Sequence, residues 1–395
     1  MTAAAVAVPL GARRARAAVA AVFLTNGALF ANVVPRYPEV KEHLDLSNAL
    51  FGTALAAGPL GALTGGLFAP LAIRLLGSAR TASFGIPLIA TAFLLVAVVP
   101  SWWLLAVVLF CSGAADAVVD VAQNAHGLRV QRIYGRSIVN SFHGVWSIGA
   151  VLGGLMGSAA AGLHVPLLIH LVVAGVLFSG VALAAYRYLL RGPDEAERPA
   201  ATGGRSFARA AVWMLAALGL LALFGALVED AGASWGALFM TEDIGATAAV
   251  AGLAFVALQV AMTAGRLLGD RLVDRFGQRT VTRIGGAVAA AGMGFALAFP
   301  SVGSALAGFA LAGLGTATLV PAAMHTADEL PGLPSGLGLT VVSWVLRIGF
   351  LASPPLVGLV ADHSSLRIGL LSVVIAGVGT LLLGRVLLNR HPAGD

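Results

Sequence analysis

The feature that most constrains this chain is a series of apolar blocks, each about twenty residues long, that recur along its whole length. A helix rises about 1.5 Å per residue, so such a block crosses the roughly 30 Å hydrocarbon core of a bilayer. Strands of a membrane β-barrel would be half as long and would alternate in polarity. The sequence therefore predicts an all-α polytopic membrane protein. Its twelve expected spans are 16–37, 47–73, 81–99, 102–125, 138–161, 166–190, 208–230, 246–268, 281–299, 303–326, 337–360 and 365–387.

Composition supports this class and the arginines set the orientation. The 395 residues are 58% hydrophobic and 11% charged, with a mean hydropathy of +0.92. If the amino terminus is cytoplasmic, the external side keeps only Arg36, Lys41 and Arg367, while the other loop arginines face the cytoplasm. This bias predicts a multi-pass protein of the bacterial inner membrane with both termini in the cytoplasm. The net charge of +6 then reflects topology and indicates no nucleic-acid partner.

An internal repeat divides the chain into two six-helix halves. A single offset of 200 residues aligns five features in equivalent places, and two matching Pro-Ser pairs are hard to obtain by chance. The expected domains are 1–190 and 210–395, joined by a polar cytoplasmic linker at 191–209. The matching features are Gly52 and Gly252, Gly65 and Gly265, Gly77 and Gly277, Pro100-Ser101 and Pro300-Ser301, and Gly149 and Gly349.

The stretch "GDRLVDRFGQR", residues 269–279, resembles the cytoplasmic loop motif of the major facilitator superfamily (MFS). Asp274, Arg275, Gly277 and Arg279 occupy its charged and glycine positions, and Asp270 stands where the family has its leading glycine. The resemblance, to bacterial sugar-porter-like and drug-transporter-like members, implies two six-helix bundles related by a pseudo-twofold axis, with a solute site between them. It also implies that the loop is a conformational latch. The alternative is a charge cluster that only sets topology.

The first-half copy of this motif, "APLAIRLLGSAR" at residues 69–80, is degenerate. Pro70 replaces the leading glycine and Arg74 replaces the acidic residue. The two loops are therefore expected to contribute unequally.

The fourth expected span, 102–125, carries a polar face inside the membrane. Asp116, Asp120 and Asn124 follow each other at i, i+4 and i+8, which places them on one side of a helix. Such a face lines a cavity or a helix contact, because acids are costly against lipid. Asp116 is a candidate proton-coupling acid. Asp120 is either a second one or a solvated residue near the helix end, and Asn124 is a candidate substrate contact.

Other polar residues in the spans extend the candidate site. Arg347 lies near mid-depth in the eleventh span, where it could pair with Asp116 or Asp120 when the cytoplasmic side closes, pair within its own half, or clamp an anionic substrate. Asn26 and Gln259 also lie near mid-depth and are candidate substrate contacts.

His143 and the tryptophans allow two interpretations each. His143 is either a proton relay or substrate contact, or a structural residue. Trp146 and Trp344 either stack on a substrate or anchor the interface. Glu229, placed at the outer end of the seventh span in "VEDAGASW", is either an outward-facing proton site or a hydrated helix end.

Together these patterns predict a secondary active transporter of a small solute, coupled to protons. No nucleotide-binding loop, metal motif or catalytic motif occurs, so we expect no cofactor and no enzymatic activity, and a monomer in the bilayer. A nutrient or sugar-like symporter is slightly favoured. A drug or metabolite exporter is the alternative, although Ala150 and Leu109 depart from the antiporter and exporter patterns. A non-transporting sensor is the alternative from another class.

Overall fold

The computed structural model describes residues 9–135, 138–192, 209–330 and 337–387, and within this part the chain is helical without strands. It contains 12 helical spans long and apolar enough to cross a membrane, which confirms the predicted number and class. A helix satisfies its backbone hydrogen bonds internally, so each span can stand in lipid. Most of the predicted linker, and the side chain of Asp270, lie outside the described residues.

Two sets of helices follow the chain. The first set consists of α1 (Leu10–Val33), η1 (Val34–Arg36), α2 (Tyr37–His43), α3 (Asn48–Leu76), α4 (Ser78–Val96), α5 (Trp102–Tyr134), α6 (Val139–Gly162) and α7 (Leu167–Tyr186). The second set consists of α8 (Arg209–Asp230), the π-helical η2 (Ala231–Trp235), α9 (Gly236–Glu242), α10 (Ala248–Ala251), α11 (Leu253–Phe276), α12 (Gln278–Ala298), α13 (Val302–Thr316), α14 (Leu319–Asp328), α15 (Leu337–His363), α16 (Leu366–Gly369), α17 (Leu371–Leu383) and η3 (Gly384–Val386).

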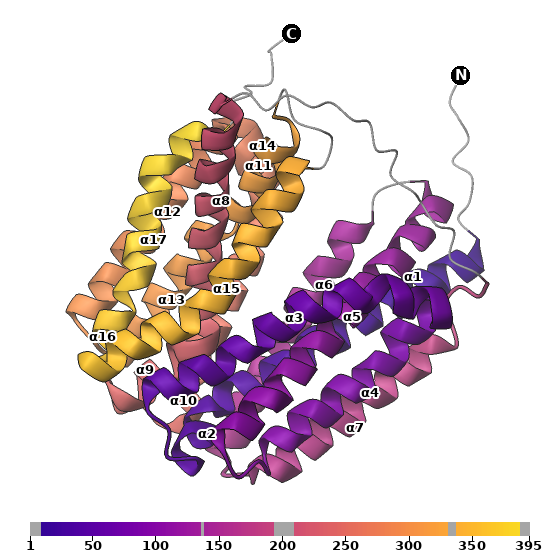
Figure 1. Cartoon of the computed structure of the whole chain (residues 1–395), viewed down its shortest axis with the longest axis horizontal. Helices are drawn as coiled ribbons and strands as arrows, with labels where there is room; N and C mark the ends of the chain where they lie inside the picture. Colours follow the sequence, from indigo (N-terminus) through magenta and orange to yellow (C-terminus); the bar gives the residue numbers. More distant parts are fainter. Residues whose placement is uncertain (1–8, 136–137, 193–208, 331–336, 388–395) are drawn as a thin grey trace.

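Each set forms its own bundle, and the bundles meet at one end only. Figure 1 shows them converging around α2, α9 and α10 and separating toward the end where α1 begins and α17 ends. We call these the closed end and the open end. Large apolar side chains such as Leu67, Leu88 and Val176 remain exposed on the outer surface, as expected for helices in lipid.

The pseudo-repeat is visible in the backbone. Gly77 and Gly277 both end one helix and start the next with positive φ, at 83° and 79°, a conformation that glycine adopts without strain. Ser101 and Ser301, also 200 residues apart, precede α5 and α13 in the same extended conformation, with φ of −157° and −155°. The offset found in the sequence therefore corresponds to equivalent turns in the two bundles.

Candidate transport site and the closed end

Three predicted residues form a hydrogen-bonded triad across three helices. Trp146 Nε1 on α6 donates to Asn26 Oδ1 on α1 over 2.7 Å, and Asn26 Nδ2 donates to Asp116 Oδ1 on α5 over 2.6 Å. An indole N–H can only donate, so it fixes the amide with its oxygen toward Trp146 and its nitrogen toward the carboxylate. Asp116 is thus held by an oriented donor, and no cation pairs with it among the described residues.

A second triad lies beside the first. His143 Nε2 is 3.1 Å from Asn124 Oδ1, and Asn124 Nδ2 donates to Asp120 Oδ1 over 3.0 Å. Because Asn124 offers its oxygen to His143, the proton of the neutral imidazole sits on Nε2. Asp120 Oδ1 also accepts a 3.2 Å hydrogen bond from Gln123. The i, i+4 spacing on α5 and the i, i+3 spacing on α6 set the two triads side by side.

The polar face predicted for the fourth span lies on α5, but Asp120 does not lie near the end of that helix as expected. Helix α5 runs to Tyr134, nine residues beyond the expected end at residue 125. Asp120 therefore lies in the body of a long helix rather than next to its end, and the expectation of a residue near the helix end is wrong. The extension "HGLRVQRIY" is too polar to be recognised as a lipid-spanning segment, yet it continues as helix beyond the apolar block.

Glu229 was also misplaced by the sequence. The seventh span does not end at Asp230 but continues through η2 and α9 to Glu242, so Glu229 lies inside the span and not at its outer end. Its Oε2 is 3.6 Å from Nη2 of Arg266 on α11, and both side chains are only partly exposed. Sequence reasoning missed Arg266, although a guanidinium inside the eighth span was a signal that could have drawn attention to it.

The remaining second-half candidates are not joined to the triads. Gln259 is buried on α11, whereas Trp344 and Arg347 are exposed on α15. Arg347 shares a helical face with Pro354 and Gly358, at i+7 and i+11. Pro354 and Gly358 on that face contact α3 at the closed end. The proposed pairing of Arg347 with Asp116 or Asp120 is not formed in this conformation.

Among the residues that the structure describes, the contacts of the loop motif all lie within the second bundle. Gly277 forms the turn between α11 and α12, and Arg279 donates through Nε and Nη2 to the carbonyl oxygen of Leu387, over 3.2 and 3.1 Å. Arg275 lies over the ring of Phe276, with 5.3 Å from guanidinium carbon to ring centroid. Asp274 is exposed, and no partner contacts it in the described part of the chain. A latch between the bundles is therefore not engaged here.

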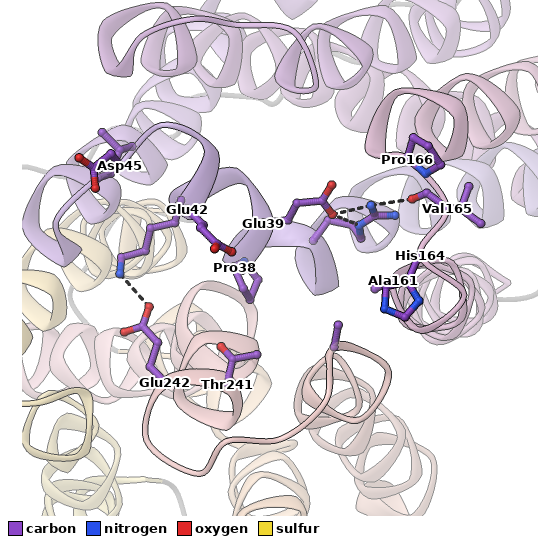
Figure 2. A pocket seen from close by; sticks show the side chains of 14 residues that line it. Pro38, Glu39, Glu42, Asp45, Ala161, His164, Val165, Pro166, Thr241 and Glu242 are labelled. Carbon is purple, nitrogen blue, oxygen red and sulfur yellow. Dashed lines mark hydrogen bonds and ion pairs between the residues drawn. The ribbon is translucent and has the colours of Figure 1, made fainter.

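At the closed end, charged groups connect the bundles. Lys41 Nζ donates to Glu242 Oε1 over 2.7 Å across a cavity of about 630 Å³ lined by both bundles. Figure 2 shows this ion pair at Glu242 and, farther along the cavity, Glu39 bonded to Arg36. On another part of the same end, Asp362 accepts hydrogen bonds from the backbone N–H groups of Asn48 and Ala49. Sequence reasoning identified none of these contacts.

Beneath these charges the bundles touch through glycines and aromatic rings. A side chain at Gly52 would collide with the carbonyl of Pro354 on α15, and one at Gly358 with the carbonyl of Asn48 on α3. Phe51 contacts Trp235 edge to face, with ring centroids 6.2 Å apart. The closed end is therefore sealed by close backbone approach and by rings from both bundles.

The chain is similar in sequence to known membrane proteins and transporters. The sequence profile of the Major Facilitator Superfamily matches residues 218–395. An uncharacterized transporter, y4wD of Sinorhizobium fredii, is 31% identical over 92% of this chain and 97% of its own length. The membrane protein MosC of Rhizobium meliloti is 32% identical over 96% of this chain and 91% of its own length. The chain belongs to the major facilitator superfamily. It is a membrane transporter of that superfamily, with twelve candidate spans in the described part of the chain.

Solved superfamily structures share the fold at low identity. A bacterial homologue of the human lysosomal transporter Spinster, inward-facing and unoccupied, has a TM-score of 0.72 at 16% identity, covering 98% of this chain and all of the other. The nucleoside transporter NupG has a TM-score of 0.69 at 14% identity, over 95% of this chain and 98% of its own. At these identities the likeness describes the fold alone.

Proposed function

We propose that this superfamily member is a proton-coupled secondary transporter that moves a small polar solute across the bacterial inner membrane by alternating access. The observation that carries the proposal is the Trp146–Asn26–Asp116 triad, in which an acid inside the spans pairs with no cation among the described residues. A buried charge without a partner is costly, so a proton or a solute hydrogen-bond donor has a ready site there. The proton gradient supplies the energy, and no cofactor or metal is needed.

We place the open end in the cytoplasm. Helix α1 begins and helix α17 ends at this end in Figure 1, and the loop arginines gather on the same side of the membrane. The conformation is then inward-open, with the closed end facing outside. A monomer is sufficient for this cycle, because the two bundles of one chain provide both sides of the site.

The two bundles offer the solute different chemistry. The first presents the acids Asp116 and Asp120 with His143, and the second presents Arg266, loosely paired with Glu229, and Arg347. A neutral polyhydroxylated or weakly polar solute can bridge acceptors and donors of this kind without neutralising either side. This favours a nutrient or sugar-like symporter, in which the solute binds while Asp116 carries the proton.

The experiment is solute-evoked proton movement in proteoliposomes. Wild type, Asp116→Asn and Asp120→Asn are compared with sugars, nucleosides, organic acids and cationic drugs as solutes, using an entrapped pH dye. We expect proton movement in the direction of solute flux, abolished by Asp116→Asn. Solute counterflow, which needs no net proton transfer, should survive in Asp116→Asn. Asp328→Asn, which changes an exposed acid at the end of α14, is the control.

The other candidate functions predict different results. Proton movement opposite to the solute identifies an exporter. Saturable solute binding with neither uptake nor counterflow identifies a sensor and contradicts transport. Proton movement that is unchanged in Asp116→Asn contradicts the assignment of that acid.

A further inference from the structure

A second acid, Asp230, is buried at the junction of the two bundles and takes no part in the triads. It ends α8, directly before the π-helical segment η2, and its side chain is 6% exposed. Ser234 Oγ donates to its Oδ1 over 2.7 Å. Its Oδ2 is buried and reaches no hydrogen-bond partner among the described residues. π-helical turns inside helices are frequent at functional sites.

Two further buried polar groups around this acid lack partners. Ser353 on α15 is fully buried and lies close enough to interact with the carboxyl group, although no hydrogen bond of good geometry reaches its Oγ in the described part of the chain. The indole nitrogen of Trp235 on η2 is equally buried and unpartnered there. Unsatisfied buried polar atoms are rare in folded proteins, and a proton on Oδ2 would both remove the buried charge and give Oδ2 a donor for Ser353 Oγ.

The surroundings of Asp230 belong to both bundles. Tyr37 on α2 is close enough to interact electrostatically with it, and the Tyr37 ring meets Phe51 with centroids 5.6 Å apart. Phe51 in turn contacts Trp235. This Tyr37–Phe51–Trp235 cluster seals the closed end over Asp230. Separation of the bundles would part Phe51 from Trp235 and bring water to the acid.

The charged and titratable groups near Asp230 leave its charge uncompensated. Glu229, its neighbour on α8, is acidic, and Tyr37 is neutral. Helix α15 brings Ser353, and α3 brings Phe51, neither of which carries charge. No Arg or Lys pairs with Asp230 among the described residues. A single small cation is therefore the species that would complete the site.

We propose that Asp230 binds a proton whenever the closed end is shut, and releases it to external water when that end opens. The proton sits on Oδ2 and donates to Ser353 Oγ, while Ser234 continues to donate to Oδ1. This inference rests on the proposed orientation of the protein, with the closed end outside. Because Asp230 is sealed in the inward-open conformation, its proton does not cross the membrane. Acidic external medium therefore favours closure without adding to the transport stoichiometry.

The test measures the closed end directly and needs no solute. In a Cys111→Ser background, spin labels at Glu42→Cys and Ala248→Cys stand on opposite bundles around the same cavity. Their distance distribution is recorded in nanodiscs between pH 5 and pH 9. If closure binds one proton, the ratio of short distances (closed) to long distances (open) falls by up to tenfold for each unit by which the pH rises in the wild type. In Asp230→Asn that dependence is lost and the short distance persists.

Control variants separate this site from its neighbours. Glu229→Gln and Asp362→Asn should keep the pH dependence, even where Asp362→Asn lowers the closed population at every pH. Asp230→Glu should keep the pH dependence of closure but change the pH at which half of the molecules are closed. Ser353→Ala removes the acceptor for the Asp230 proton, so it should move that midpoint to lower pH. These two variants decide the question if Asp230→Asn does not fold.

Three outcomes would overturn the proposal. One is a pH dependence in Asp230→Asn equal to that of the wild type. Another is an unmoved midpoint in both Asp230→Glu and Ser353→Ala. The third is a distance distribution that responds to Na⁺ at constant pH but not to pH at constant Na⁺. None of these depends on Asp116, so the proposed coupled transport can fail while this site stands, and the reverse also holds.

Discussion

The carboxylate of Asp362 accepts a 2.8 Å hydrogen bond from the backbone N–H of Asn48, 314 residues earlier in the chain. A neighbouring bond of 2.9 Å comes from Ala49. The last residues of α15 thus cap the first turn of α3, so an acid of the second bundle satisfies the orphan donors of a helix in the first. Opening of the closed end must break this cap.

Asp362→Asn should therefore weaken closure. Asn keeps one acceptor oxygen but loses the charge at the start of α3, which costs about 0.3–1 kcal/mol, or roughly two- to fivefold in the ratio of closed to open molecules. The spin-label pair at Glu42→Cys and Ala248→Cys measures that ratio. Glu39→Gln, a change on the cavity wall that leaves this cap intact, is the control. An unchanged ratio in Asp362→Asn would show that the cap contributes nothing to closure.

The Lys41–Glu242 ion pair should contribute less. Lys41→Glu and Glu242→Lys each place like charges together and should lower the closed population, while the exchanged pair should restore it. Exposed pairs of this kind contribute about 0.2–1 kcal/mol, so the coupling should shrink in high salt. The double-mutant cycle, measured with labels at His43→Cys and Ala248→Cys at two ionic strengths, checks this. Two single-charge effects that simply add would contradict a direct pair.

Close backbone contact makes Gly52 sensitive to one added methyl group. In Gly52→Ala the new carbon meets the carbonyl of Pro354 and should wedge the bundles apart at the closed end. Overpacking costs about 1–3 kcal/mol, so the ratio of open to closed molecules should increase by a factor between about five and about one hundred. Gly66→Ala on the same helix has open space and is the matched control. Equal distance distributions in the two variants would refute the wedge.

Trp146→Phe should alter the proton dependence of transport rather than abolish transport. Without the indole N–H, Asn26 is no longer held with its nitrogen toward Asp116, so the charged carboxylate loses an oriented donor. One hydrogen bond is worth about 0.5–1.5 kcal/mol, which moves half-maximal proton-coupled flux roughly half to one pH unit upward. Trp344→Phe, which removes an exposed indole on α15, is the control. Identical pH profiles for the two variants would exclude this role.

Gly277→Ala should destabilise the protein at the loop between α11 and α12. At φ 79° and ψ 146° the backbone lies close to a region essentially restricted to glycine, so a side chain costs about 1–3 kcal/mol and the thermal unfolding midpoint should fall accordingly. Gly303→Ala, in open space near the start of α13, should leave the midpoint unchanged or slightly raised. A midpoint for Gly277→Ala equal to that of the control would mean that the turn tolerates a side chain.

Much of this fold could be predicted from the sequence because the bilayer constrains the spans. Hydrocarbon thickness sets a minimum length for each span, so twelve apolar blocks translate directly into twelve helices. The face formed by Asp116, Asp120 and Asn124 follows from helical periodicity alone, and the bond between Asp120 and Asn124 is its local expression. Such features depend on residues close together in the chain.

Contacts between helices could not be foreseen in the same way. Nothing near Asn26 in the sequence indicates that α1 and α5 pack so that its amide meets Asp116. Glu229 and Asp230 resemble a helix end because adjacent acids usually lie in water. They remain inside the span because Arg266 and Ser234, from elsewhere in the bundle and from the next turn, bind them. Tertiary partners override the local signal.

The cap at Asp362 and the ion pair at Lys41 are contacts between the bundles, along the seam at the closed end, that can break and re-form at low cost. Each is an exposed polar contact, so water replaces it when the seam parts, and the net free energy exchanged is about 1 kcal/mol per bond. The Phe51–Trp235 contact beneath them has no such substitute, so the apolar part of the seam carries most of the cost of separation. Hydration thus keeps the two conformations near in energy, within reach of the few kcal/mol that a bound solute provides.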